Sequence, residues 1–153
     1  MDKPYTVGGP ALAEVNAPFA PAMPPLLEAP PEFVVCTPEE ALRVPGRRSY
    51  FEYLDFGMRQ ASNGQVSAQV VQASESLAEP TGWHYHTVEA QLIYLARGWV
   101  DTDFENGFTG RIPVGSFIMI PGGYRHNEIA TAPDLVTFEV VLGQMNTVPC
   151  GAP

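Results

Sequence analysis

Residues 82–98 of this chain read GWHYHTVEAQLIYLARG, and residues 115–126 read GSFIMIPGGYRH. These two stretches contain all three histidines of the protein. His84 and His86 are two positions apart, so on a strand both imidazoles point to the same face. His126 follows a Pro-Gly-Gly turn that can aim it inward. Imidazoles that converge from different strands suit Zn, Cu, Fe and Ni, so the pattern predicts one metal centre.

The surrounding sequence predicts an all-β fold. From Ser49 onward, short alternating or apolar segments recur, and Gly, Pro, Asn and Asp separate them. Many short strands at regular spacing are typical of a sandwich or a barrel. The predicted strands cover residues 50–56, 65–73, 83–86, 90–96, 99–104, 108–112, 116–120 and 135–142.

The first stretch resembles the first sequence motif of the cupin family, in which a glycine, an HxH pair, an acidic residue and a second glycine follow one another. His84, His86, Gln91 and Gly98 occupy the last four positions, with four residues between His86 and Gln91 and six between Gln91 and Gly98. Glutamine therefore stands in the slot of the acidic ligand. Gln91 can bind a metal through its amide oxygen, or can only hydrogen-bond a metal-bound water. A neutral ligand set leaves the ion's charge uncompensated, which favours an anionic bound species.

The second stretch resembles the second cupin motif. Gly115, Pro121, Gly123 and His126 match its glycine, proline, glycine and histidine, whereas Ala130 replaces the asparagine that usually follows. Sixteen residues separate the two motifs, as in small cupins. The resemblance implies a cupin double-stranded β-helix, which is a jelly-roll barrel of two antiparallel sheets. It also implies one bound divalent transition metal, which can be Fe, Ni, Zn, Mn or Cu.

The distribution of prolines predicts how the chain is divided. Ten of the sixteen prolines lie in residues 1–45, too densely for a helix or an inner strand. We expect a Pro-rich arm over residues 1–48, either a loose tail or packed on the body or a second subunit. The barrel then covers residues 49–145, and residues 146–153 form a C-terminal tail. One short helix is expected at about residues 38–43, because Thr-Pro-Glu-Glu before it reads as a capping box.

Charge and composition exclude several classes of partner. The net charge is −9, which argues against nucleic acids and anionic membrane surfaces. No apolar run approaches the ~18 residues of a membrane helix, and no secretory signal is visible. Cys36 and Cys150 do not form a CxxC pair, so we expect two free thiols and a cytoplasmic protein, although a disulfide between them stays possible.

Other side chains near the motifs are candidates for the site. Glu89 precedes Gln91 by two residues and would share its face on a regular strand, so it is a candidate catalytic base or an alternative ligand. Ile93 and Ile118 are expected to line an apolar pocket. Tyr124 and Arg125 directly precede His126 and are candidates for orienting a substrate anion.

The resemblance implies several functions for such a site. We favour a dioxygenase-like enzyme that acts on a small anionic or enolisable organic substrate. The alternatives are a Lewis-acid isomerase or lyase, and a non-catalytic cupin that binds or senses a small molecule. The resemblance also implies a homodimer. The sequence contains no element that would bind DNA, so a small molecule is the expected ligand.

Overall fold

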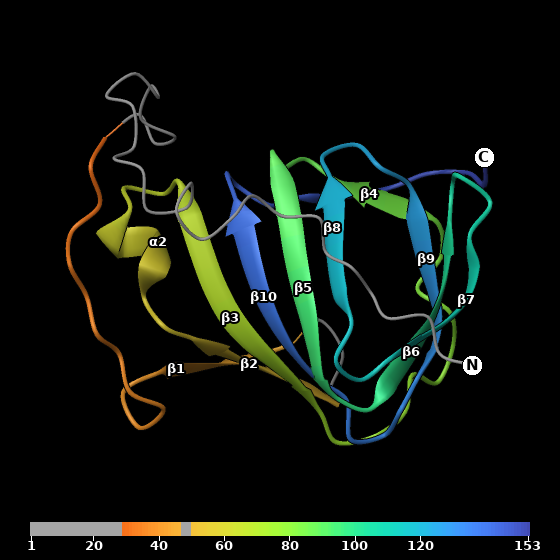
Figure 1. The fold of residues 1–153 in the computed structure, drawn as a ribbon, viewed down its shortest axis with the longest axis horizontal. Helices are drawn as coiled ribbons and strands as arrows, with labels where there is room; N and C mark the ends of the chain where they lie inside the picture. Colours follow the sequence, from red (N-terminus) through yellow and green to blue (C-terminus); the bar gives the residue numbers. More distant parts are fainter. Residues whose placement is uncertain (1–28, 47–49) are drawn as a thin grey trace, which may run out of the picture.

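The computed structural model describes residues 29–46 and 50–153, and these form two antiparallel β-sheets that face each other (Figure 1). Sheet A has the order β1 (Leu42–Pro45), β2 (Phe51–Asp55), β3 (Val66–Ala73), β10 (Val136–Leu142), β5 (Ala90–Arg97) and β8 (Phe117–Pro121). Sheet B has the order β11 (Thr147–Pro149), β4 (His84–His86), β9 (His126–Thr131), β6 (Trp99–Phe104) and β7 (Thr109–Pro113). The predicted all-β jelly roll is confirmed.

Successive side chains along each strand point to opposite faces of the sheet, and those that point inward form the core between the sheets. Leu95 on β5 and Val141 on β10 are 0% and 1% exposed, because their side chains point inward. Leu95 also packs with Val100, Ile112 and Leu135 in one buried cluster. Most of this cluster also lines the internal cavity, so the hydrophobic core forms part of the wall of the site.

The short helix predicted at residues 38–43 is not formed. The capping box itself exists, since the Thr37 backbone N–H donates to Glu40 Oε2 at 2.9 Å, and the chain makes one turn there. Residues 42–45 then become strand β1 and pair with β2, because sheet pairing satisfies more backbone groups than one further helical turn. The short helix of the described residues, α2 (Met58–Ala61), lies after β2 instead.

The two sheets extend beyond the predicted barrel, residues 49–145, at both ends. Strand β1 lies in the predicted arm and β11 in the predicted tail, yet both pair with barrel strands. Strand β9 was not predicted, because its inward positions carry polar side chains rather than an apolar alternation. Most of the predicted arm, residues 1–28, lies outside the described residues. Its described end is bonded to the body, since the Glu32 N–H donates to the Ala61 carbonyl at 2.7 Å.

Strands β10, β5 and β8 carry apolar side chains on their outward face. Tyr94, Phe117, Met119 and Phe138 are 39%, 66%, 66% and 40% exposed. Tyr94 pairs across the sheet with both Phe117 and Phe138, so these side chains form one continuous surface. The predicted homodimer stays a prediction.

Two further expectations concern the thiols and the membrane. Cys36 and Cys150 are both free, as expected. In residues 29–46 and 50–153, no helix is long and apolar enough to cross a membrane.

Candidate metal centre

The three histidines converge between neighbouring strands of sheet B. β4 carries His84 and His86, β9 carries His126, and His84 and His126 are directly paired in the ladder. One ligand nitrogen from each lies within 4.8 Å of the other two, and the three side chains are buried. An ion bound at ~2.0–2.1 Å holds its nitrogens no more than ~4.2 Å apart. Small side-chain rotations are therefore enough to close this cluster around one ion.

Hydrogen bonds on the far side of each ring prepare the histidines to bind a metal. His84 Nδ1 lies 2.8 Å from the Gly82 carbonyl, and His126 Nδ1 lies 2.9 Å from the Tyr124 carbonyl. A carbonyl only accepts, so Nδ1 must carry the proton and Nε2 keeps its lone pair. His86 Nδ1 is bonded to Thr147 Oγ1 at 3.0 Å. Such outer bonds fix the tautomer and orientation of metal-binding imidazoles, so the residues present fit a divalent metal.

A carboxylate that was not predicted lies beside this cluster. Glu128 is two residues after His126 on β9, so both side chains point into the barrel. Its Oε1 lies 3.6 Å from His126 Nε2, and its Oε2 lies 3.7 Å from His84 Nε2. The alternation in His-Asn-Glu was a signal that could have revealed this residue. Glu128 supplies a negative charge that is absent at Gln91.

The surroundings of Glu128 favour its ionised form. Burial alone raises the pKa of this carboxyl, but attraction to His126 and His84 when these imidazoles are protonated, together with the hydrogen bond from Thr81, outweighs it, so the pKa falls below its usual value in the metal-free chain. Thr81 Oγ1 donates to Glu128 Oε2 at 2.6 Å. Glu128 is therefore an oriented carboxylate that can accept a proton or approach a cation.

Gln91 lies where the cupin resemblance placed it, with its side chain in the cavity and only 5% exposed. Its Nε2 donates to Glu139 Oε2 at 3.4 Å. Its Oε1 is the one buried side-chain polar atom without a hydrogen-bond partner in the described part of the chain. Buried polar atoms normally have a partner, so an unpaired oxygen in the cavity that His84 and His86 also line supports a bound metal or ligand here.

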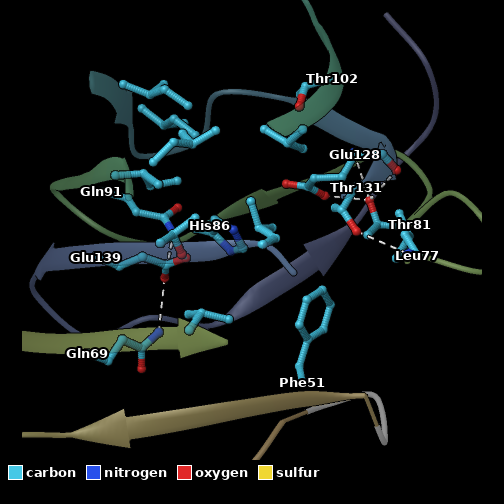
Figure 2. Close-up of a pocket in the computed structure, with 18 of the residues that line it drawn as sticks. Phe51, Gln69, Leu77, Thr81, His86, Gln91, Thr102, Glu128, Thr131 and Glu139 are labelled. Atoms are coloured by element: carbon cyan, nitrogen blue, oxygen red, sulfur yellow. Dashed lines mark hydrogen bonds between the residues drawn. The ribbon is translucent and has the colours of Figure 1, made fainter. Parts of the chain in front are cut away.

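Glu139 forms a second group of polar side chains on sheet A. Gln69 Nε2 donates to its Oε2 at 3.0 Å, and Thr137 Oγ1 donates to its Oε1 at 3.2 Å. Burial raises the pKa of Glu139, and the nearby Glu128 charge acts in the same direction, while the hydrogen bonds only partly oppose them. In Figure 2, Gln69, Gln91 and Glu139 lie on one side of the pocket, and Thr81 and Glu128 lie on the other.

The cavity between the sheets has a volume of ≈ 270 Å³. Ile93 and Ile118 line it, as expected, together with aromatic side chains and both glutamates. Tyr124 and Arg125, the other two residues predicted for the pocket, do not line it. Tyr124 packs near Phe104, with ring centroids 6.2 Å apart. Arg125 Nε donates to Glu105 Oε2 at 2.8 Å, so its charge is directed to that carboxylate.

Glu89, the predicted catalytic base, is exposed and does not line the cavity. The prediction assumed that the strand continues regularly from Glu89 to Gln91. Strand β5 begins only at Ala90, and residues 88 and 89 form a bend. The alternation rule therefore does not extend to Glu89, and Glu128 occupies the position beside the histidines.

Comparison with solved structures identifies the fold. The polyketide cyclase RemF from Streptomyces resistomycificus is similar, with TM-score 0.60, 14% identity and coverage of 76% of this chain and 84% of that one. KdgF from Halomonas sp. has TM-score 0.59, 16% identity and coverage of 73% and 94%. Fe(II)-HppE with the alternative substrate (S)-1-HPP has TM-score 0.56, 14% identity and coverage of 72% and 60%. No protein-family model matches the chain, and no curated protein does. The likeness shows the fold, a cupin-like barrel of two antiparallel sheets.

Proposed function

We propose that this protein is a mononuclear-metal enzyme that catalyses proton transfer in a small enolisable organic substrate, as in an elimination, isomerisation or cyclisation. The observation that carries the proposal is the position of Glu128, within 3.7 Å of two histidine Nε2 atoms in the cavity between the sheets. His84, His86 and His126 would hold the metal, with Gln91 Oε1 as a further ligand. A divalent ion held there would supply Lewis acidity towards a substrate oxygen.

The residues of the chain have distinct roles in this proposal. Glu128 accepts a proton from carbon, because Thr81 fixes one of its oxygens and the carboxylate faces the cavity beside the histidines. Apolar side chains such as Ile93 and Ile118 exclude water from the substrate. Glu128 thereby takes the role that the sequence suggested for Glu89. RemF, a structural neighbour, is described as a polyketide cyclase, which is compatible with this class of reaction.

A dioxygenase-like reaction is the second candidate function. Its support is the histidine-rich ligand set and the likeness in fold to HppE, which was solved with Fe(II). Iron or copper would supply redox chemistry with dioxygen. We place it second because an oriented carboxylate beside the histidines is directly useful for proton transfer.

Deuterium exchange tests the proposal without knowledge of the natural substrate. The zinc-loaded and iron-loaded proteins are incubated in D₂O with small ketones, diketones and 2-oxo acids, and loss of C–H signals is followed by proton NMR. We expect metal-dependent exchange in at least one compound. Glu128→Gln should slow it about 100-fold or more, as expected for a general base, whereas the exposed Glu89→Gln should match the wild type.

Oxygen consumption by the iron-loaded or copper-loaded protein, measured with the same compounds, distinguishes the second candidate. Oxygen uptake without C–H exchange would favour the dioxygenase. Binding of compounds without exchange or oxygen uptake would contradict both enzymatic functions and favour a non-catalytic cupin.

A further inference from the structure

Besides the histidines and Glu128, the cavity contains a second polar group on sheet A, centred on Glu139. Glu139 lies on β10, which runs between β3 and β5. Gln69 and Gln91, on these two flanking strands, each donate a side-chain hydrogen bond to its Oε2 (Figure 2). Thr137 donates to its Oε1. Three neighbouring strands therefore hold one carboxylate inside the barrel.

Among the described residues, no lysine or arginine pairs with this carboxylate inside the cavity. None of the described residues that line the cavity is a lysine or an arginine. A buried carboxylate without a paired cation costs free energy, and an apolar residue of similar size would usually make such a site more stable. Fold stability alone therefore does not explain Glu139, and a role in ligand binding does.

The hydrogen bonds around Glu139 define what a ligand must bring. An ionised carboxylate can accept about four hydrogen bonds, and three side chains donate to this one. One acceptor position of Glu139 thus stays unused, and a ligand can fill it with a donor such as a hydroxyl group.

The charges of the cavity indicate that this ligand is uncharged. Two carboxyl groups, Glu128 and Glu139, line the cavity, and no lysine or arginine does so among the described residues. An anionic ligand would add a further negative charge beside them, which is unfavourable. The anionic bound species expected from the neutral Gln91 stays a prediction, and these two carboxyl groups favour an uncharged ligand instead.

The size and the walls of the cavity limit the ligand further. A volume of ≈ 270 Å³ has room for about nine water molecules, since each takes ~30 Å³ in the liquid. Phe51, Tyr53 and Phe104 line it from both sheets. Aromatic faces and a small volume suit a molecule of one ring.

We propose that Glu139, held by Gln69 and Thr137, binds a hydroxyl group of the substrate, and that the substrate is a small, uncharged, hydroxylated ring. This inference rests on the proposed function for the metal-side chemistry and adds a specificity-determining residue on the opposite sheet. Glu139 fixes the hydroxyl and so places the rest of the ring towards the histidines and Glu128.

Binding of matched probes to the zinc-loaded full-length protein tests the inference. The panel consists of small rings in triples, the first being resorcinol, 1,3-dimethoxybenzene and 3-hydroxybenzoate. Calorimetry or NMR titration gives the affinities. We expect hydroxylated rings to bind at least about tenfold more tightly than their methylated counterparts, as for a hydrogen bond to a charged group. We also expect the carboxylated members to bind most weakly.

Variants connect this preference to Glu139. Glu139→Gln should remove the preference for hydroxyl over methoxy and should improve binding of the carboxylated ring. Thr137→Val should weaken the preference, because it removes one of the bonds that orient the carboxylate. The exposed Glu89→Gln should change none of the affinities, and thermal unfolding verifies that all variants are folded.

Several results would overturn the inference. These are equal affinity for hydroxylated and methylated rings across the panel, tightest binding of the carboxylated rings, absence of binding by any hydroxylated ring, or an unchanged preference in folded Glu139→Gln. Failure of the proposed function would give a different set of results. Hydroxylated rings would then bind in a Glu139-dependent manner, while no compound would show C–H exchange. Exchange without Glu139-dependent binding would contradict only the inference.

Discussion

The two sheets place different polar groups in the same cavity. On sheet B the histidine pole consists of His84, His86, His126 and Glu128, and its rings are held by bonds to backbone carbonyls and Thr147. On sheet A the carboxylate pole consists of Gln69, Gln91, Thr137 and Glu139. The first pole presents lone pairs, which suit an ion. The second presents a carboxylate without a fixed cation, which suits a hydrogen-bond donor. On our proposals, metal binding falls to sheet B and ligand recognition to sheet A of the same cavity.

Removal of a histidine should have the largest effect, because it breaks the ion-binding pole directly. His126→Ala is expected to lower zinc affinity by more than about 100-fold, since even residues that only orient metal ligands contribute 10- to 100-fold. Competition with a chromophoric chelator measures this. Glu89→Ala is the control and should bind zinc as the wild type does. An affinity of His126→Ala within threefold of the wild type would contradict the assignment of the centre.

Gln91 donates to Glu139 through its Nε2, and its Oε1 is the further metal ligand of the proposed function, so its variant tests whether Gln91 serves both poles. Gln91→Ala is expected to lower zinc affinity by roughly tenfold, less than loss of a histidine, because an amide oxygen is a weaker ligand. The same chelator competition measures it. Unchanged affinity would show that Gln91 serves the ligand and not the metal.

Glu139→Gln tests whether the carboxylate pole reduces stability. Burial raises the pKa of Glu139 above its usual value of 4.5, so its ionised form destabilises the folded chain. This penalty is absent at pH well below 4.5 and becomes complete as pH rises through the folded pKa. The metal-free variant should therefore be more stable than the wild type by about 1 kcal/mol at pH 7, or about 2–4 °C in Tm.

At pH 4, where the carboxyl is mostly protonated in both states, this difference should largely disappear. Thermal unfolding with a chelator present measures both values. A variant that is less stable than the wild type at pH 7 would contradict this account of the carboxylate pole.

We expect the smallest effect, a small change in melting temperature, at the ion pair between Arg125 and Glu105, which lies outside both poles. The hydrogen bonds from Arg125 hold the pKa of Glu105 below its usual value. The stabilisation is therefore present above the unfolded pKa and is lost as pH falls through the folded pKa. Glu105→Gln should melt slightly below the wild type at pH 7 and together with it at pH 2.5. An equal difference in melting temperature at pH 7 and at pH 2.5 would show that the ion pair acts through packing and not through charge.

The sequence predicted the histidine pole better than the carboxylate pole, for a physical reason. The HxH pair and the Pro-Gly-Gly turn before His126 are local patterns, and strand alternation places their side chains on one face. Glu128 follows the same rule from His126, but β9 was not predicted as a strand because its inward side chains are polar.

The carboxylate pole depends on long-range pairing that no local pattern reveals. Gln69 and Glu139 meet because β3 and β10 pair in a register that joins residues 70 positions apart. Gln and Glu at such positions resemble the polar half of any amphipathic strand. Glu89 was misplaced for the opposite reason, because a bend before β5 breaks a pattern that looked regular.

The central claim is that the histidine pole binds one metal ion inside the barrel. Anomalous diffraction from crystals of the zinc-loaded protein, recorded on both sides of the zinc absorption edge, tests it most directly. We predict a single peak at full occupancy within about 2.0–2.2 Å of Nε2 of His84, His86 and His126. No peak at this position, or zinc bound only elsewhere on the protein, would contradict the account.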